Sequence, residues 1–395
     1  MKVKGFFVLL FGGLSVFSCR SQQDRPQRTY EGRVEVIHNG FEPYRIKGEA
    51  SHLTLEKYLT IDFERPDLAI TGIPRIASFD VDSQGNIYVW GNRSSGNFIF
   101  KFDAAGSFDR SFGRSGQGPR EIGALSYLRI IERDEIVVSD YGRNNLILMT
   151  AAGNVIKEIR LSSQMDTATL LANGKLLTWK STYHPEEAIE ELEVVLCDTE
   201  LKELAVLGPS EKLPNWGRAK KINGLETMPT WGQGSIAKGR IYVGNKQCGY
   251  EISVYDLEGK LLRKIRKAHR PVAVPADIRK KVLAVFDLPI HKGQKSKLHF
   301  TASMPSIQYF FVDDQGRLFV MTFEKGENPG YYVYDAFYPD GVFIGRTSLD
   351  NTGNESSEIW GGPFEVRAKN GLLYFIRAKN SGYQELVVYQ MAWTE

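Results

Sequence analysis

Cysteine is scarce in this 395-residue chain, which contains only three. Cys19 is the cysteine that we expect to be lipidated, so a disulfide would have to join Cys197 to Cys248. These two residues are expected on opposite faces of a sheet-built fold, farther apart than the ~7 Å that a disulfide allows between Cα atoms. We therefore predict two free thiols and a fold stabilised by its hydrophobic core.

Common catalytic motifs are also missing. The sequence has no His-Glu-x-x-His zinc motif, Gly-x-Ser-x-Gly elbow, P-loop or EF-hand loop. Excess charge is missing as well, because the formal net charge is +3, or +1 once Lys2 and Lys4 are removed with a leader. A nearly neutral, exported chain is not expected to bind nucleic acid. No catalytic residue and no cofactor is predicted from these observations.

The apolar run at residues 5–17 is too short to cross a bilayer, which needs about 20 residues. Lys2 and Lys4 precede it, and Val-Phe-Ser-Cys at residues 16–19 resembles a bacterial lipobox. We predict that residues 1–18 are a lipoprotein signal peptide, that Cys19 is lipidated and that residues 19–32 form a tether. Arg20 favours the outer membrane, and the sequence leaves open which side the protein faces. The alternative is an ordinary secretory signal with an incidental cysteine.

An apolar run that breaks at a short polar turn and resumes as a second apolar run occurs six times. Each copy predicts a β-hairpin. A hairpin repeated at this spacing is typical of a radial β-architecture rather than of a single sheet. The six copies occupy residues 79–89, 129–138, 169–178, 235–243, 310–320 and 365–375.

A second hairpin follows each of the first five copies, at residues 98–112, 146–159, 194–207, 252–265 and 332–347. Two hairpins make four strands, and a four-stranded repeat of about 40–50 residues is a propeller blade. The sixth copy has only a third strand, residues 385–392, and the strand-like residues 55–63 can supply its fourth. We predict an all-β fold, a six-bladed β-propeller over residues 33–395 that an N-terminal outer strand closes. Residues 33–46 are expected to pack outside the ring.

Three segments resemble a known family. Residues 78–113, with Asp-Ser-Gln-Gly-Asn-Ile-Tyr-Val at 82–89, resemble an NHL-type propeller repeat. Residues 112–123 resemble the Gly-Gln-Gly-Pro-Gly-Glu-Phe connection of bacterial six-bladed propellers, with Arg120 and Ile122 in place of Gly and Phe. Residues 36–43 resemble the N-terminal portion of those proteins. The chain is thus similar to bacterial six-bladed β-propeller lipoproteins with NHL-like repeats, which implies fold, export and lipidation but no catalytic motif.

The long connections are all predicted on one face of the ring, called here the long-loop face. With strands a to d counted outward from the axis, every long segment is a b–c or d–a connection: residues 180–192, 209–229, 267–305, 323–331 and 349–363. Because function concentrates on such loops, we predict that this face binds a partner. The alternative is that these loops vary in length because nothing constrains them.

Aromatic and arginine side chains on this face have the character of binding residues. Trp231 is expected near the central channel. For each aromatic taken singly, packing between blades is the alternative. The predicted binding residues are Arg93, Tyr141, Arg143, Tyr183, Trp216, Arg218, Trp231, Tyr250 and Arg377.

The insertion at residues 267–305 contains a predicted helix over residues 275–287, with Ile278, Val282, Val285 and Phe286 on one side. Residues 260–297 hold twelve Lys or Arg and two Asp, a local charge of +10 that leaves about −9 for the rest of the mature chain. Such a segment favours anionic partners such as lipopolysaccharide, anionic lipid or an acidic protein. The alternative is a solvated, lysine-rich surface.

Two functions are compatible with these sequence observations. The first is a lipid-anchored, monomeric, non-enzymatic platform at the cell envelope that binds an envelope protein or a glycan through the long-loop face. The alternative is a metal-dependent hydrolase or lyase with Ca²⁺ or Zn²⁺ at the channel mouth. Its candidate ligands are Asp140, Glu226, Glu324 and His184. Three or more carboxylates or imidazoles within reach of one metal ion would favour the enzyme.

Overall fold

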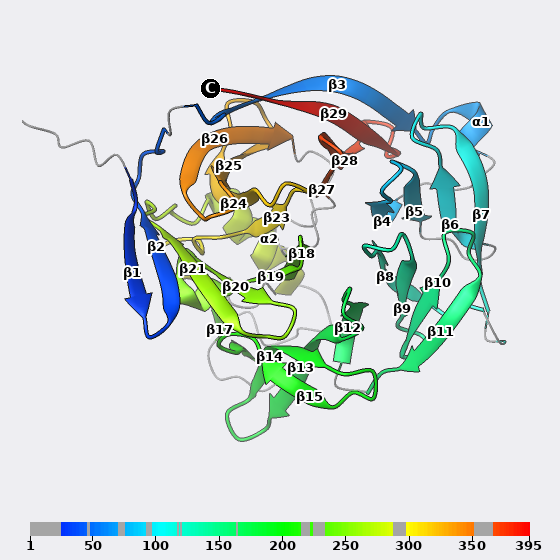
Figure 1. The fold of residues 1–395 in the computed structure, drawn as a ribbon, viewed down its shortest axis with the longest axis horizontal. Helices are drawn as coiled ribbons and strands as arrows, with labels where there is room; N and C mark the ends of the chain where they lie inside the picture. The colour runs from blue at the N-terminus through cyan, green and yellow to red at the C-terminus, as the bar shows by residue number, and fades with distance from the viewer. Residues whose placement is uncertain are drawn as a thin grey trace, which may run out of the picture.

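Six sheets surround a central axis in the computed structural model of this protein (Figure 1). The structure describes residues 25–45, 48–69, 76–91, 97–116, 118, 121–162, 165–214, 222–223, 234–286, 298–350 and 366–395. Each sheet is antiparallel in its four blade strands and runs outward from the axis, which makes it a propeller blade. The predicted six-bladed β-propeller is therefore confirmed.

The strands follow one another outward in each blade. Blade 1 contains β4 (Ile76–Val81), β5 (Ile87–Gly91), β6 (Asn97–Phe102) and β7 (Phe108–Arg114). Blade 2 contains β8 (Leu125–Ile130), β9 (Ile136–Asp140), β10 (Asn145–Met149) and β11 (Val155–Arg160). Blade 3 contains β12 (Met165–Leu170), β13 (Leu176–His184), β14 (Ile189–Cys197) and β15 (Glu203–Val206), and β16 (Glu211–Pro214) also pairs with β14.

The last three blades include the N-terminal strands. Blade 4 contains β18 (Gly234–Ala237), β19 (Arg240–Gly244), β20 (Glu251–Asp256) and β21 (Leu261–Lys267), extended by β2 (Val34–Asn39) and β1 (Gln27–Glu31). Blade 5 contains β23 (Tyr309–Val312), β24 (Leu318–Lys325), β25 (Tyr331–Phe337) and β26 (Phe343–Asp350). Blade 6 contains β27 (Val366–Lys369), β28 (Leu372–Ala378), β29 (Gln384–Thr394) and β3 (His52–Asp62).

The ring closes between the two ends of the chain, as predicted. β3 pairs antiparallel with β29 from Asp62↔Glu385 to His52↔Thr394. In Figure 1 the blue β3 and the red β29 run side by side along the upper edge of the ring. Ile61 of β3 and Leu386 of β29 are buried in one cluster with Phe79, Val89 and Phe100 of blade 1. Closure therefore joins blade 6 to blade 1 through a shared apolar core.

The turns on the face opposite the long loops are short and repeat one design. In five of them an Asp Oδ1 accepts hydrogen bonds from the backbone N–H groups two and four residues later. Gly85 follows with φ of +84°, a conformation that costs a glycine little. The Asp-containing turns begin at Asp82, Asp103, Asp198, Asp256 and Asp313.

Helices are few and short in the described part of the chain: α1 (Pro66–Ala69), α2 (Ala276–Phe286) and the 3₁₀ turn Lys246–Cys248. α2 confirms the helix predicted in the insertion, and Ile278 and Val282 are buried with Met304. Among these described helices none has the length and apolar content needed to cross a membrane. Cys197 is buried, Cys248 is exposed, and both are free thiols, as predicted.

An N-terminal hairpin covers the outer edge of blade 4. β1 pairs antiparallel with β2, and β2 pairs parallel with β21. Val36 and Ile37 are fully buried there. Gln27–Glu31 therefore forms a strand, although these residues were predicted to belong to the tether. These residues form a strand because β1 hydrogen-bonds to the otherwise free edge of β2 and carries an acidic residue that pairs with blade 4.

Ion pairs fasten this hairpin. Glu31 lies 2.7 Å from both Lys264 and Arg266, and Glu35 lies 2.8 Å from Arg263. Arg28 lies 2.6 Å from Glu35 and 2.6 Å from Asp340 of blade 5. Three of the twelve basic residues between positions 260 and 297 are thus paired with the hairpin. The surface charge of this segment is smaller than the sequence predicts.

Acidic pH should weaken the ion pairs that attach the N-terminal hairpin to blade 4. Burial raises the pKa of Glu35, but the pairs with Arg28 and Arg263 outweigh burial and hold the pKa below its ordinary value of 4.5. Its stabilising effect is therefore present above that value and is lost as the pH falls through the folded-state pKa. We expect Glu35→Gln to lower the free energy of unfolding by about 1 kcal/mol at pH 7. The difference from the wild type should shrink below pH 4.5, and an equal difference at pH 3 and pH 7 in urea titrations would contradict this account.

Candidate functional site

The long-loop face carries ordered additions to the ring. β13 and β14 continue beyond the blade as far as the pair His184↔Ile189, and β16 adds a third strand beside this extension. Residues 180–192 were predicted as a loop, and this is corrected: most of them form paired strands around a tight turn. Strand pairing satisfies the backbone N–H and C=O groups that a long loop would leave to water.

Two insertions meet on the same face. β17 (Ile222–Asn223) and β22 (Leu298–His299) pair in parallel, which joins the connection after blade 3 to the one after blade 4. α2 lies in the second of these insertions and packs through Ile278 and Val282 toward Phe323 of β24. The insertion is therefore seated on blade 5.

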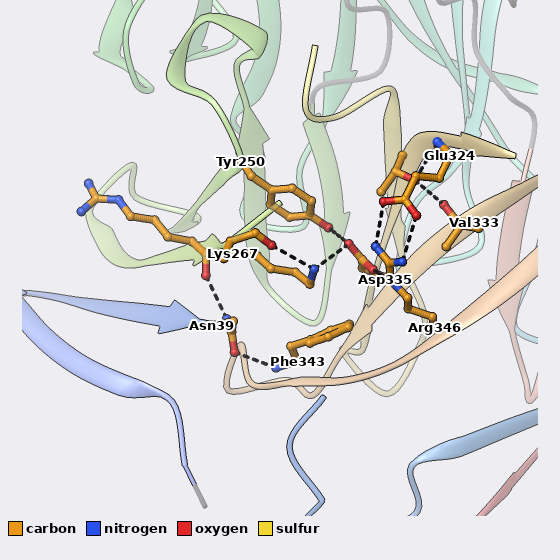
Figure 2. A network of polar contacts seen from close by, with 11 residues as sticks. Asn39, Tyr250, Lys267, Glu324, Val333, Asp335, Phe343 and Arg346 are labelled. Carbon is orange, nitrogen blue, oxygen red and sulfur yellow. Dashed lines mark hydrogen bonds and ion pairs between the residues drawn. The ribbon is translucent and has the colours of Figure 1, made fainter. Parts of the chain in front are cut away.

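A cluster of buried charges lies at the seam between blades 4 and 5, beneath this insertion (Figure 2). Asp335 in β25 is fully buried. Its Oδ2 accepts a hydrogen bond from the Tyr250 hydroxyl at 2.7 Å and lies 3.4 Å from Lys267 Nζ. Its Oδ1 accepts a hydrogen bond from Arg346 Nε at 2.9 Å. One carboxylate therefore holds three side chains from two blades.

Burial shapes the electrostatics of the cluster. It lowers the pKa of Lys267, although the charge of Asp335 opposes the shift. It raises the pKa of Tyr250, and the charge of Asp335 adds to that effect. Lys267 Nζ also lies 4.4 Å from the centre of the Phe343 ring, within range of a cation–π interaction. Lys267 and Asp335 thus form an ion pair within the seam that water does not reach.

Arg346 connects the cluster to the surface. Its Nη1 and Nη2 donate to the two carboxylate oxygens of Glu324 at 2.9 and 3.0 Å. Burial alone would lower the pKa of Arg346, but Glu324 and Asp335 raise it above the ordinary value. The guanidinium is therefore permanently charged and fixed on two sides.

A bulge in β24 directs Glu324 to this place. Met321 pairs with Tyr334 and Lys325 with Tyr332, so residues 322–324 oppose Val333 alone. The Thr322 hydroxyl donates to Val333 O at 3.1 Å and accepts from Glu324 N at 3.2 Å, which holds the bulge. Bulges are frequent beside functional sites because they redirect side chains. Here the bulge places Thr322 and Glu324 at a small cleft, whose polar lining includes His269, Arg270, Ser306, Thr322, Glu324 and Arg346.

Two predicted binding residues are exposed on the long-loop face. Tyr141 follows β9 and is 74% exposed, and Tyr183 in the extension of β13 is 40% exposed. Tyr250 was predicted at the same surface and is instead only 5% exposed, because its hydroxyl is bound to Asp335 inside the seam. This prediction is corrected.

The two described arginines of the predicted set have internal partners. Arg143 donates to Glu121 O at 2.6 Å and lies 3.7 Å from Glu158. Arg377 donates to Glu385 at 2.6 Å. Both stabilise connections of the ring. Arg93, Trp216, Arg218 and Trp231 lie outside the described residues, as does Cys19.

The candidate metal ligands do not come together in the described structure. Both oxygens of Asp140 accept backbone N–H groups, from Gly123 and Ala124. His184 contacts Glu191 at 2.8 Å, and Glu324 pairs with Arg346. Glu226 lies outside the described residues. Within the ranges that the structure describes, no three His, Cys, Asp or Glu side chains are placed to hold one metal ion.

The seam cluster was not predicted. Lys267 belongs to the basic run of residues 260–297, but its partner Asp335 is far along the chain, within the Tyr-rich strand β25. No local pattern marks a single Asp as the partner of three distant side chains. Only pairing of β25 with β26, beside blade 4, brings them together.

The comparisons with known proteins agree with this architecture. Residues 62–216 match the sequence profile of a family described as a 6-bladed beta-propeller. A candidate exported protein from Bacteroides fragilis NCTC 9343 is similar in structure, with a TM-score of 0.54, 11% identity, and alignment over 91% of this chain and 100% of that one. A member of the DUF4221 family from Bacteroides vulgatus ATCC 8482 has a TM-score of 0.52 and 11% identity, over 88% and 100% of the two chains. The curated proteins contain no match.

Proposed function

We propose that this six-bladed β-propeller is an exported, lipid-anchored, non-enzymatic platform at the cell envelope, and that it binds an envelope protein or a glycan through its long-loop face. The observation that carries the proposal is the asymmetry of the two faces. One has short turns braced by Asp side chains, and the other has a strand extension, a helical insertion and a bridge between insertions. Ordered additions confined to one face are typical of a binding surface.

Location is inferred from the N-terminal segment. The apolar run of residues 5–17 and Cys19 after Ser18 support export and lipidation, which together anchor a protein stably when two or more chains are attached. The Bacteroides fragilis propeller of the same fold is itself described as a candidate exported protein. Arg20 supports the outer membrane as the destination.

Exposed aromatics on the long-loop face should contribute most to partner binding. We expect the double variant Tyr141→Ala and Tyr183→Ala to reduce the amount of captured partner about tenfold, because rigid aromatic side chains dominate interface energies. The measurement is affinity purification from detergent-solubilised envelopes, with the tag after Glu395. β29 ends on the opposite face, so the tag leaves the long-loop face open.

The matched control is Tyr58→Ala, because Tyr58 is 58% exposed on the outer strand β3 of blade 6. This variant should capture the same partner as the wild type. Equal capture by all three proteins would contradict the assignment of the face. In the same cells Cys19→Ser should move the protein from the membrane fraction to the soluble fraction, and unchanged fractionation would contradict the lipid anchor.

A further inference from the structure

The guanidinium of Arg346 is oriented by the core and presents its outer edge to the cleft at the seam of blades 4 and 5. Arg346 Nε donates a hydrogen bond to Asp335, which is fully buried, so the planar guanidinium group cannot rotate freely. The remaining pair of N–H groups points away from the core, toward Glu324 (Figure 2). A fixed pair of parallel donors is the geometry that recognises a carboxylate.

Glu324 occupies that edge in the way that a bound ligand would. Both its oxygens accept hydrogen bonds from Arg346, and its side chain is 33% exposed while that of Arg346 is 41% exposed. Solvent screening at this exposure limits the strength of even a bidentate pair, so Glu324 can move into solvent at a moderate cost. Because residues 322–324 share Val333 as their one opposite residue, Glu324 has no ladder partner of its own on β25, and rotation of its side chain breaks no strand pair.

Other polar side chains line the cleft and could form hydrogen bonds with a ligand. Ser306 Oγ is buried and has no hydrogen-bond partner among the described residues. A buried hydroxyl without a protein partner is unusual, and a water molecule or a ligand group can satisfy it. His269 also lines the cleft, and the Thr322 hydroxyl beside it is engaged by Val333 O and Glu324 N. With Glu324 in place the cleft has room for about one water molecule, so a larger group requires that Glu324 leave.

We propose that this cleft binds the carboxylate of a uronic acid in a glycan, with Arg346 as its bidentate partner and Glu324 as the internal carboxylate that the ligand displaces. A uronic acid fits because its ring hydroxyls suit Ser306 and His269, whereas its carboxylate suits Arg346. The proposal rests on the platform function and specifies a ligand class for part of the same face. The displaced Glu324 carboxylate moves to solvent, where it keeps its charge.

The experiment is a titration of the full mature chain in detergent with D-glucuronate, followed by saturation-transfer NMR, with D-glucose as the neutral sugar. The wild type should bind glucuronate and not glucose. Glu324→Gln should bind glucuronate about three- to fivefold more tightly, since the internal competitor loses its charge. Arg346→Lys should bind about tenfold more weakly, because an ammonium cannot replace the bidentate donor pair.

The control is Glu385→Gln, which removes the carboxylate of a less exposed Arg–Glu pair, Arg377 with Glu385, on blade 6. This variant should bind as the wild type does. Absence of glucuronate binding by both the wild type and Glu324→Gln would overturn the proposal. So would an unchanged affinity in Glu324→Gln, which removes no partner of Asp335 and is expected to fold.

Tighter binding of N-acetylalanine than of glucuronate would also overturn it, in favour of a peptide terminus. The outcome of the glucuronate titration can be distinguished from the outcome of the affinity purification, which tests the platform function. If glucuronate does not bind but capture still depends on Tyr141 and Tyr183, only the assignment of the cleft is wrong. If partner capture does not depend on Tyr141 and Tyr183 while glucuronate binds as expected, the assignment of partner binding to these exposed tyrosines of the long-loop face is wrong.

Discussion

Asn in place of Asp335 is expected to destabilise the protein by about 3–5 kcal/mol, although the two side chains have nearly the same shape. Asp335 is the shared partner of Lys267, Tyr250 and Arg346. The substitution leaves the Lys267 ammonium, whose side chain is 1% exposed, without a counter-charge in a place that water does not reach. The cost is large because desolvation of the cation is no longer offset by the attraction of the carboxylate.

Urea unfolding followed by tryptophan fluorescence measures this effect. Asp340→Asn is the control, because Asp340 pairs with Arg28 at a side chain that is 45% exposed, and it should cost no more than about 1 kcal/mol. A second variant, Lys267→Met with Asp335→Asn, should recover part of the loss, since no uncompensated ammonium then remains. If Asp335→Asn unfolds at the same urea concentration as the wild type, the seam cluster has no structural importance.

Ile61→Asp should be as damaging, because it places a charge inside the closure of the ring. Ile61 lies in β3, is 1% exposed and packs with Leu386 and the core of blade 1. We expect a loss of about 4 kcal/mol or more, from the lost apolar burial and the cost of a buried carboxylate. Since β3 is the strand that links the N-terminus to the last blade, separation of β3 from β29 should open the ring.

Tyr58→Asp is the matched control on the same strand. Tyr58 is 58% exposed, so the same new charge meets water and should change the free energy of unfolding by less than about 1 kcal/mol. Proteolysis at residues of β3 should accompany unfolding of Ile61→Asp and not of the control. Equal stability of the two variants would show that the β3–β29 pairing does not hold the ring closed.

Most of the fold could be predicted because its signals are local. The six inner hairpins, the five outer hairpins and α2 each arise from apolar periodicity and turn residues that lie within a few positions of each other. Even the β3–β29 closure followed from counting, because residues 385–392 lacked a fourth strand. The strand β1 was missed since Gln27–Glu31 is polar and gains its order from β2 rather than from its own composition.

The candidate site was predicted less well for the same physical reason. The long-loop face followed from the lengths of the connections, and Tyr141 and Tyr183 are exposed on it. Tyr250 was assigned to that surface because it is an aromatic residue in a connection on that face, yet its hydroxyl binds Asp335, 85 positions away in β25. The surface charge of residues 260–297 was overestimated, since Glu31 and Glu35 approach Arg263, Lys264 and Arg266 only when β2 pairs with β21.

The sequence by itself determined what depends on neighbouring residues: the strands, the tight turns, the number of blades and the face that carries the long connections. Only the tertiary structure decided which charges meet, and so it alone identified the Asp335 cluster, the Glu324–Arg346 pair and the bulge that directs Glu324. Apolar patterns repeat with the period of the backbone and can be read along the chain. A buried ion pair has no such period, because its energy depends on a distance of a few ångströms between segments that the sequence keeps far apart.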